Sequence, residues 1–178
     1  MVKNYNEIIS SESENTLRKI IGESLFKIYS PYIEVEDNVI TSSSFSIEIN
    51  GEWINFSNSW KETTNNIDYY KFQIELDSTP KDIKFNKEKN TLEHPVSSIL
   101  FNRGAKEKQI EKIEIYSKNQ VWGSEKITYD HAVVFYPKND FRICINVLEQ
   151  VTDQLECIIN DNLIYSLISG SNLRMVIQ

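Results

Sequence analysis

The segment "SFSIEINGEWINFS", residues 44–57, decides how we expect this chain to fold. Apolar and polar residues alternate along both of its halves, which is the pattern of β-strands with one buried face. Asn50 and Gly51, between the halves, tolerate a positive φ and are a strong signal for a two-residue hairpin turn. Folding about this turn pairs apolar residues of the two strands on one face. These pairs are Phe45 with Phe56 and Ile47 with Ile54. The segment therefore predicts a β-hairpin whose inner face belongs to the core.

The other face of this hairpin is polar, acidic and aromatic, and it lies in a stretch without basic residues. Residues 30–60 contain no lysine or arginine, although the whole chain has 19. An exposed aromatic side chain within an acidic surface is typical of a site that binds a basic protein. An ordinary solvated acidic surface is the alternative that the sequence leaves open. The partner-binding residues that we predict here are Glu34, Glu36, Asp37, Glu48, Glu52 and Trp53.

A helix is predicted before the hairpin, over residues 11–30. Ser11 and Glu14 have the spacing of a capping box, and apolar residues then recur at helical intervals. Pro31 prevents the helix from continuing.

After the hairpin, alternating apolar residues predict a strand over residues 68–76. Its inward residues are Tyr70, Phe72, Ile74 and Leu76. The next predicted elements are a short strand at 82–86, a helix at 94–104, and strands at 109–117, 126–137 and 140–148. The end of the chain fits either one long helix or a strand, a helix and a strand. The turn signal "NDN" at 160–162 and the preceding β-branched pair favour the second pattern.

These elements predict an α+β fold. We expect a single antiparallel meander sheet, with the N-terminal helix and one or two shorter helices packed on one face. No linker, repeat or low-complexity tract divides the sequence, so residues 1–178 are predicted to form a single globular domain.

Composition excludes several classes of function. The net charge is −7 and the pI about 5.0, so nucleic acid is not expected as a partner, since phosphate binding needs a surplus of Lys and Arg. We see no signal peptide and no apolar run of membrane-spanning length, which predicts a cytoplasmic protein without a membrane contact. Cys144 and Cys157 lie among apolar residues and are expected to be buried free thiols, although a disulfide between them stays open.

Motifs for catalysis, cofactors and metals are absent from the sequence. There is no phosphate-binding glycine loop, no dinucleotide fingerprint, no nucleophile elbow and no paired Cys or His with metal-ligand spacing. Asp130 and His131 are neighbours in a predicted strand and would point to opposite faces, whereas Tyr129 and His131 would share one. We therefore predict no catalytic residue, no metal and no cofactor. Tyr129 and His131 are the pair to test if the protein is an enzyme.

The acidic hairpin "FSIEINGEWINFSNSW" (45–60) and the meander "IEIYSKNQVWGSEKITYDHAVVFYPKNDFRICI" (113–145) give this chain a recognisable character. Its richness in Ile, Asn and Lys is typical of AT-rich bacterial genomes. Small acidic α+β proteins of this kind resemble the bacterial immunity proteins of polymorphic and contact-dependent toxin systems. The resemblance implies a non-enzymatic inhibitor that neutralises a basic toxin partner by binding it.

Two other functions stay open at this stage. The first is a small-ligand-binding or enzymatic domain with a cavity under a curved sheet, in which Tyr129 and His131 would act. The second is a structural or accessory protein that self-associates through an exposed sheet edge or face.

Overall fold

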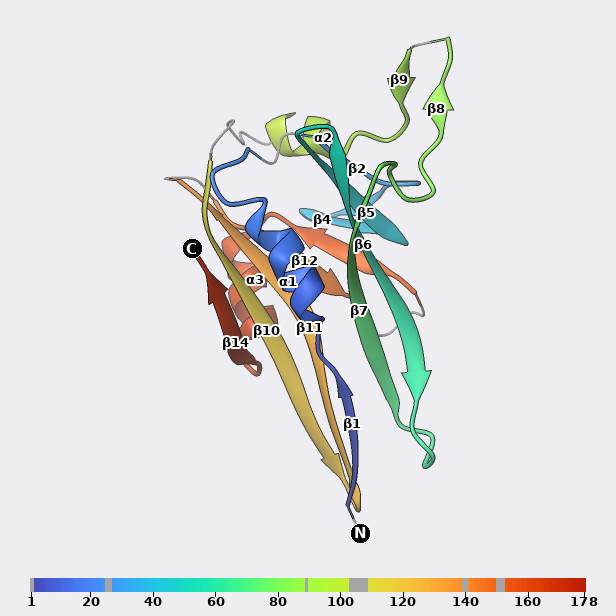
Figure 1. The fold of residues 1–178 in the computed structure, drawn as a ribbon, viewed down its shortest axis with the longest axis vertical. Coiled ribbons are helices and arrows are strands. Elements are labelled where there is room, and N and C mark those ends of the chain that lie inside the picture. Colours follow the sequence, from blue (N-terminus) through green and yellow to red (C-terminus); the bar gives the residue numbers. More distant parts are fainter. Residues whose placement is uncertain (1, 25–26, 89, 103–108, 139–140, 150–152) are drawn as a thin grey trace.

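Most of the chain forms two β-sheets that pack face to face (Figure 1). The structure is a computed structural model that describes residues 2–24, 27–88, 90–102, 109–138, 141–149 and 153–178. The larger sheet has eight strands in the order β14-β10-β11-β12-β13-β4-β3, and β1 pairs with β11 in parallel. Its strands are β1 (Lys3–Glu7), β3 (Glu34–Glu36), β4 (Val39–Ser42), β10 (Ile110–Trp122), β11 (Glu125–Pro137), β12 (Ile143–Val147), β13 (Leu155–Ile158) and β14 (Asn172–Ile177).

The smaller sheet has four antiparallel strands in the order β2-β5-β6-β7. They are β2 (Ile28–Tyr29), β5 (Ser44–Ile49), β6 (Glu52–Glu62) and β7 (Asp68–Asp77). A separate two-stranded hairpin consists of β8 (Phe85–Asn86) and β9 (Thr91–Leu92). The helices are α1 (Ser11–Arg18), α2 (Val96–Asn102) and α3 (Asp161–Ile168). None of the helices in the described ranges is long and apolar enough to span a bilayer.

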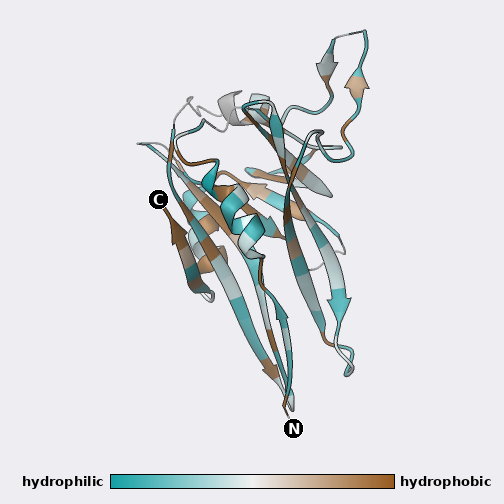
Figure 2. Cartoon of the chain, in the orientation of Figure 1, coloured by the Kyte–Doolittle hydropathy of each residue, from teal (hydrophilic) through white to brown (hydrophobic). Residues whose placement is uncertain are grey.

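The main core lies between the two sheets. Phe56 of β6 meets Phe135 of β11 edge to face, with ring centroids 6.1 Å apart. Leu17 at the end of α1 is fully buried in the same cluster, so α1 extends the layer of the smaller sheet beside β7. A smaller cluster on the opposite face of the larger sheet buries Ile164 of α3 against Val134. Figure 2 shows apolar and polar segments following one another along β10 and β11, as expected for strands between these layers.

The predicted hairpin is confirmed. Asn50 has a φ of 52° and Gly51 a φ of 84°, which are the left-handed conformations that a two-residue turn requires. Phe45 pairs with Phe56 and Ile47 with Ile54, in the predicted register.

The prediction of a single sheet is wrong, and so is the prediction of helices on one face, because α1 and α3 lie on opposite sides of the larger sheet. The antiparallel pairing and the mixture of helices and strands are confirmed. The chain leaves the larger sheet at the end of β4 and enters the smaller sheet at Ser44, with one residue between the two strands. Strand alternation shows that one face of a strand is buried, but it does not show which sheet the strand joins.

The predicted N-terminal helix is shorter than expected. It begins after Ser10, whose hydroxyl accepts the N–H of Ser13, and it ends at Arg18. Gly22 then has a φ of 84°, and its N–H donates to the carbonyl of Ile110 over 2.8 Å. Bridging to the start of β10 thus replaces the last helical turns, and Ile28 lies in β2 instead.

The later elements occur near their predicted positions, although β8 is shorter than predicted, β9 was not predicted and β10 continues to Trp122. β7 buries Tyr70, Phe72 and Ile74, but Leu76 at its end is exposed. The final strand, helix and strand are β13, α3 and β14. The last two residues of the predicted helix, 103–104, and the first residue of the strand predicted at 140–148 lie outside the described residues.

Both cysteines are buried free thiols, as predicted. Cys144 belongs to the cluster beneath α3, and Cys157 belongs to the core between the sheets. The two thiols therefore lie on opposite faces of the larger sheet, where no disulfide can join them.

Candidate functional site

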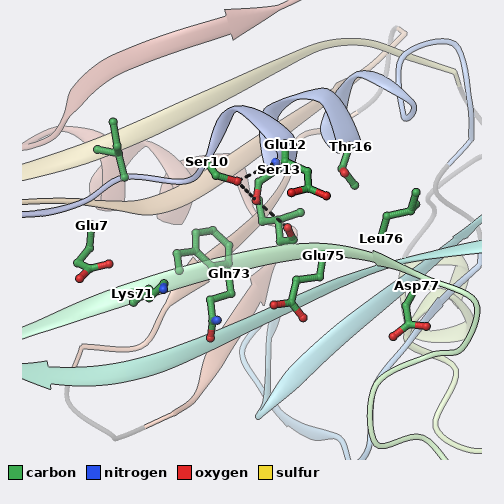
Figure 3. A pocket seen from close by; sticks show the side chains of 13 residues that line it. Glu7, Ser10, Glu12, Ser13, Thr16, Lys71, Gln73, Glu75, Leu76 and Asp77 are labelled. Atoms are coloured by element: carbon green, nitrogen blue, oxygen red, sulfur yellow. Dashed lines mark hydrogen bonds between the residues drawn. The ribbon is translucent and has the colours of Figure 1, made fainter.

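A groove of about 530 Å³ follows the seam between α1 and β7 (Figure 3). Glu7, the last residue of β1, and Ile8, which follows it, also line the groove. Its walls come from the groove-facing side of α1 and from the second half of β7. The lining residues are Glu7, Ile8, Ser10, Glu12, Ser13, Thr16, Lys71, Phe72, Gln73, Ile74, Glu75, Leu76 and Asp77.

The seam exists because α1 covers the edge of the smaller sheet. β7 is the last strand of that sheet and pairs with β6 without a register shift. The hydroxyl of Ser13 donates to the carbonyl of Ile74 over 2.7 Å, so this carbonyl points away from β6 and toward the helix. Covering an edge in this way prevents another strand from adding to it. The groove therefore lies above a closed seam and not along an open sheet edge.

A partly buried ion network holds α1 in place from the other side. Arg174 of β14 contacts Glu14 of α1 at 2.7 Å and Asp130 of β11 at 2.8 Å. Asp130 also accepts the backbone N–H of Ile9, just before the helix. The pairing of β10 with β11 skips His131, and its pairing with β14 skips Arg174, so both strands bulge beside this network. The α1 wall of the groove is thus fixed to two strands of the larger sheet.

The groove carries an excess of negative charge. Glu7, Glu12, Glu75 and Asp77 contribute four carboxylates, against the ammonium group of Lys71. Within the described ranges none of the four carboxylates forms an ion pair. Asp77 accepts the backbone N–H of Ser78 at 2.6 Å, which fixes the position of its carboxylate at the end of β7. Unpaired carboxylates in a concave site favour a cationic ligand.

The charges are not spread evenly along the groove. Lys71, Gln73, Glu75 and Asp77 alternate with the buried residues of β7. In Figure 3, Lys71 lies near Glu7 at one end, Glu12 and Glu75 extend from opposite walls near the middle, and Asp77 lies at the other end. The end that includes Glu12, Glu75 and Asp77 is therefore the more acidic one.

Thr16 adds a hydroxyl to the lining of the groove. Its exposed fraction is 5%, and it lines the groove from α1. Figure 3 shows its side chain extending from the helix toward the β7 side. No contact in the part of the chain that the structure describes gives its hydroxyl a hydrogen-bond partner. The hydroxyl opens into the groove, where water or a ligand can bind it.

The predicted partner-binding residues lie elsewhere and in two separate places. Glu34 and Glu36 are exposed on β3, at the far edge of the larger sheet. Asp37 follows them in a turn with a φ of 45°. Glu48, Glu52 and Trp53 lie on the β5–β6 hairpin of the smaller sheet. The first group therefore belongs to the larger sheet and the second to the smaller sheet.

Trp53 corrects the expectation of an exposed aromatic side chain. It is only 8% exposed and packs against Tyr29 of β2, with ring centroids 5.8 Å apart. The connection after β7 folds over the same face, and the N–H of Lys81 donates to Ser46 and Asn55. The outer face of the hairpin is therefore largely covered by the chain itself. Its two acids are engaged as well, because Glu48 pairs with Lys27 at 2.8 Å and Glu52 pairs with Lys19 at 2.7 Å.

The possible catalytic residues are buried and engaged. The hydroxyl of Tyr129 donates to Glu149 over 2.8 Å, and burial together with this carboxylate raises the pKa of Tyr129. His131 is fully buried, and burial, helped by Lys118 and opposed by Glu149, lowers the pKa of His131 to about 4. The histidine is therefore neutral at pH 7.

His131 and Ser171 have the distance of a base and a nucleophile but lack the group that would orient the base. Nε2 of His131 lies 2.7 Å from the hydroxyl of Ser171. Nδ1 is buried and has no partner among the described residues, and the carboxylate of Asp130 is engaged by Arg174 and Ile9. A working pair normally has a third group on the second nitrogen. We interpret His131–Ser171 as a structural hydrogen bond.

Metal chemistry receives no support from side-chain clusters. Across the residues described, no group of three or more His, Cys, Asp or Glu side chains could hold a metal ion.

Comparison of this chain with protein families, with curated proteins and with solved structures gives no match. The site is therefore argued from its own geometry.

Sequence reasoning missed the groove because its residues come from two distant segments of mixed composition. Glu7 and Glu12 flank the start of α1, whereas Glu75 and Asp77 end a strand more than sixty residues later. The one local signal was the alternation of polar residues along β7, which indicated an outward face. Only the packing of α1 beside β7 brings the two sets of acids together.

Proposed function

We propose that this protein is a non-enzymatic binding module that takes a basic partner protein into the groove between α1 and β7. The observation that carries the proposal is a concave site with four carboxylates that lack ion pairs within the described residues. The net charge of −7 attracts a basic protein over a distance, and the groove supplies a local site for it.

An immunity-type inhibitor of a basic toxin is the form of this function that agrees with the character of the sequence. Such an inhibitor must capture its target quickly, and charge complementarity raises association rates. The ion network behind α1 supports this role because it holds one wall of the groove in place before binding.

The geometry favours a protein-binding function. The alternative, a ligand-binding or enzymatic cavity in which Tyr129 and His131 act, receives less support. Both residues are almost completely buried, and the hydroxyl of Tyr129 and Nε2 of His131 form hydrogen bonds within the protein. Apolar side chains from both sheets pack around Tyr129 in the main core.

Two variants with the same net charge test the proposal. The groove variant carries Glu7→Gln, Glu12→Gln, Glu75→Gln and Asp77→Asn. The control variant carries Glu34→Gln, Glu36→Gln, Asp37→Asn and Glu52→Gln, which neutralises acids that the sequence predicted to bind a partner. Both sets leave Trp53 and the core intact, so circular dichroism should show wild-type folding for each.

The measurement is capture of proteins from the lysate of the native host, at low and at high salt, with each variant beside the wild type. We expect a basic protein to bind the wild type and the control variant, and to be lost from the groove variant. High salt should weaken its capture, because exposed charges are screened beyond about 8–10 Å. Equal capture by both variants, or loss from the control variant alone, would contradict the groove as the binding site.

A further inference from the structure

We infer that the groove binds an extended segment of the partner that carries lysine or arginine at alternate positions. This inference rests on the proposed function and makes it more specific, because it states how the cations of the partner are spaced. The occupant is one stretch of a basic protein, lying along β7 over the seam with α1.

The spacing follows from the regular geometry of β7. The strand pairs with β6 from Trp53–Asp77 to Glu62–Asp68 without a bulge. Glu75 and Asp77 therefore project from the same side of the strand, about 6.6–6.8 Å apart along it. An extended peptide has the same repeat, so its alternate side chains come into register with these two carboxylates.

The α1 wall of the groove adds to the preference for a cation beside Glu75. Glu12 projects from the first turn of α1 and faces Glu75 across the groove (Figure 3). A cation at that level would lie between two carboxylates. At the other end, Lys71 repels a cation, so we expect the basic residues of the segment to gather toward Asp77 and a neutral or acidic residue to lie near Lys71.

Thr16 gives the groove a hydrogen-bonding group in addition to its carboxylates. Its side chain is nearly buried, but its hydroxyl opens into the groove and has no partner within the described chain. The backbone of an extended segment presents an N–H or a carbonyl at every residue, and either one can bind a hydroxyl. We expect the segment to supply this missing partner.

The segment does not add to the sheet as a further strand. The carbonyl of Ile74 already accepts a hydrogen bond from the hydroxyl of Ser13, and α1 covers that edge of the sheet. Binding therefore comes from side-chain charges and from contacts such as Thr16, which makes it sensitive to the positions of the cations rather than to a backbone ladder.

Two nine-residue peptides of identical composition test the spacing. Both contain three lysines among serines and glycines; the first has them at positions 3, 5 and 7, and the second at positions 2, 5 and 8. In an extended chain the first peptide presents all three lysines on one side, whereas the second presents its middle lysine on the opposite side. Affinity for the full chain is measured by calorimetry at low salt.

We expect the first peptide to bind about fivefold more tightly, which is the effect of losing one well-placed ion pair. The variant Glu75→Gln with Asp77→Asn should remove this difference, and Thr16→Val should weaken the first peptide several-fold. The variant Glu34→Gln with Glu36→Gln, which has the same net charge, should bind both peptides like the wild type.

The outcomes separate this inference from the proposed function. Equal binding of both peptides, lost in the groove variant, would overturn the alternate spacing and leave the proposed function standing. Binding of neither peptide, together with capture of a partner that the groove variant retains, would overturn both. Spermidine that competes as strongly as the first peptide would overturn the choice of a protein segment as occupant.

Discussion

The hydroxyl of Ser13 on α1 donates to the main-chain carbonyl of Ile74 on β7, across 2.7 Å. This bond closes the seam beneath the groove, and it joins the N-terminal helix to a strand that lies 61 residues later in the chain. Ser13 is 9% exposed, so the bond is protected from water. It links the stability of the fold to the shape of the proposed binding site.

Replacement of Ser13 by alanine should therefore affect both properties. The change leaves the carbonyl of Ile74 without its partner, and we expect it to lower the free energy of unfolding by about 1–2 kcal/mol. Ser11, exposed in the same helix, gives the matched control Ser11→Ala, which should change stability little. Urea denaturation measures both variants. Equal stability of the two would show that the Ser13–Ile74 bond contributes nothing.

The turn between β5 and β6 gives a prediction about the backbone. Gly51 has a φ of 84°, a conformation that side chains other than glycine adopt with strain. We expect Gly51→Ala to lower the free energy of unfolding by about 1 kcal/mol or more.

Gly170 has no such conformation, and a Cβ there would meet nothing within 4 Å. Gly170→Ala is therefore the control for Gly51→Ala, and thermal unfolding compares the two. An equal loss in both variants would mean that the positive φ at Gly51 is not the cause.

The local signals in the sequence were reliable where a single segment decides the structure. The Asn50–Gly51 turn, the alternation of β7 and the turn signal before α3 all act over a few residues, and the structure contains each of these elements. The helix end was misjudged because Ile20 and Ile21 continue a helical pattern, whereas bridging to Ile110 and Gln109 ends it. That competition depends on a strand almost ninety residues away.

The candidate site was harder to predict for the same reason. A sequence shows that Glu48 and Trp53 share a face, but it does not show that Tyr29 and the connection after β7 cover that face. Likewise, Glu12 and Glu75 become neighbours across a groove only through tertiary packing. Patterns along the chain predict which residues share a face of a helix or strand. Tertiary packing decides which of these faces stays exposed to solvent.

The burial of Trp53 predicts effects of different size for two tryptophans of β6. Trp53 is 8% exposed and Trp60 is 40% exposed. We expect Trp53→Ala to lower the free energy of unfolding by about 3 kcal/mol, because it removes a large side chain that packs on Tyr29. Trp60→Ala should cost clearly less.

Urea denaturation of both tryptophan variants gives the comparison. A small loss of stability in Trp53→Ala together with loss of partner binding would contradict the burial of Trp53 and would support the exposed binding role that the sequence predicted.

His131 predicts a loss of stability in mild acid. Burial lowers the pKa of His131 in the folded protein to about 4, whereas an unfolded chain binds the proton near pH 6.5. Between these values the unfolded state holds more protons than the folded state, so stability falls as the pH decreases from about 6.5 toward about 4. The full difference corresponds to about 3 kcal/mol. Above pH 7 the histidine is neutral in both states and the effect disappears.

The variant His131→Gln isolates this contribution, because glutamine can still bond to Ser171 but does not titrate. Urea denaturation at pH 7.5 and at pH 4.5 should show a larger loss in the wild type than in the variant. Carboxylates elsewhere titrate equally in both proteins, so the difference between the two losses belongs to His131. Equal losses would mean that His131 accepts a proton in the folded state without cost, as an exposed histidine with a solvated ring would.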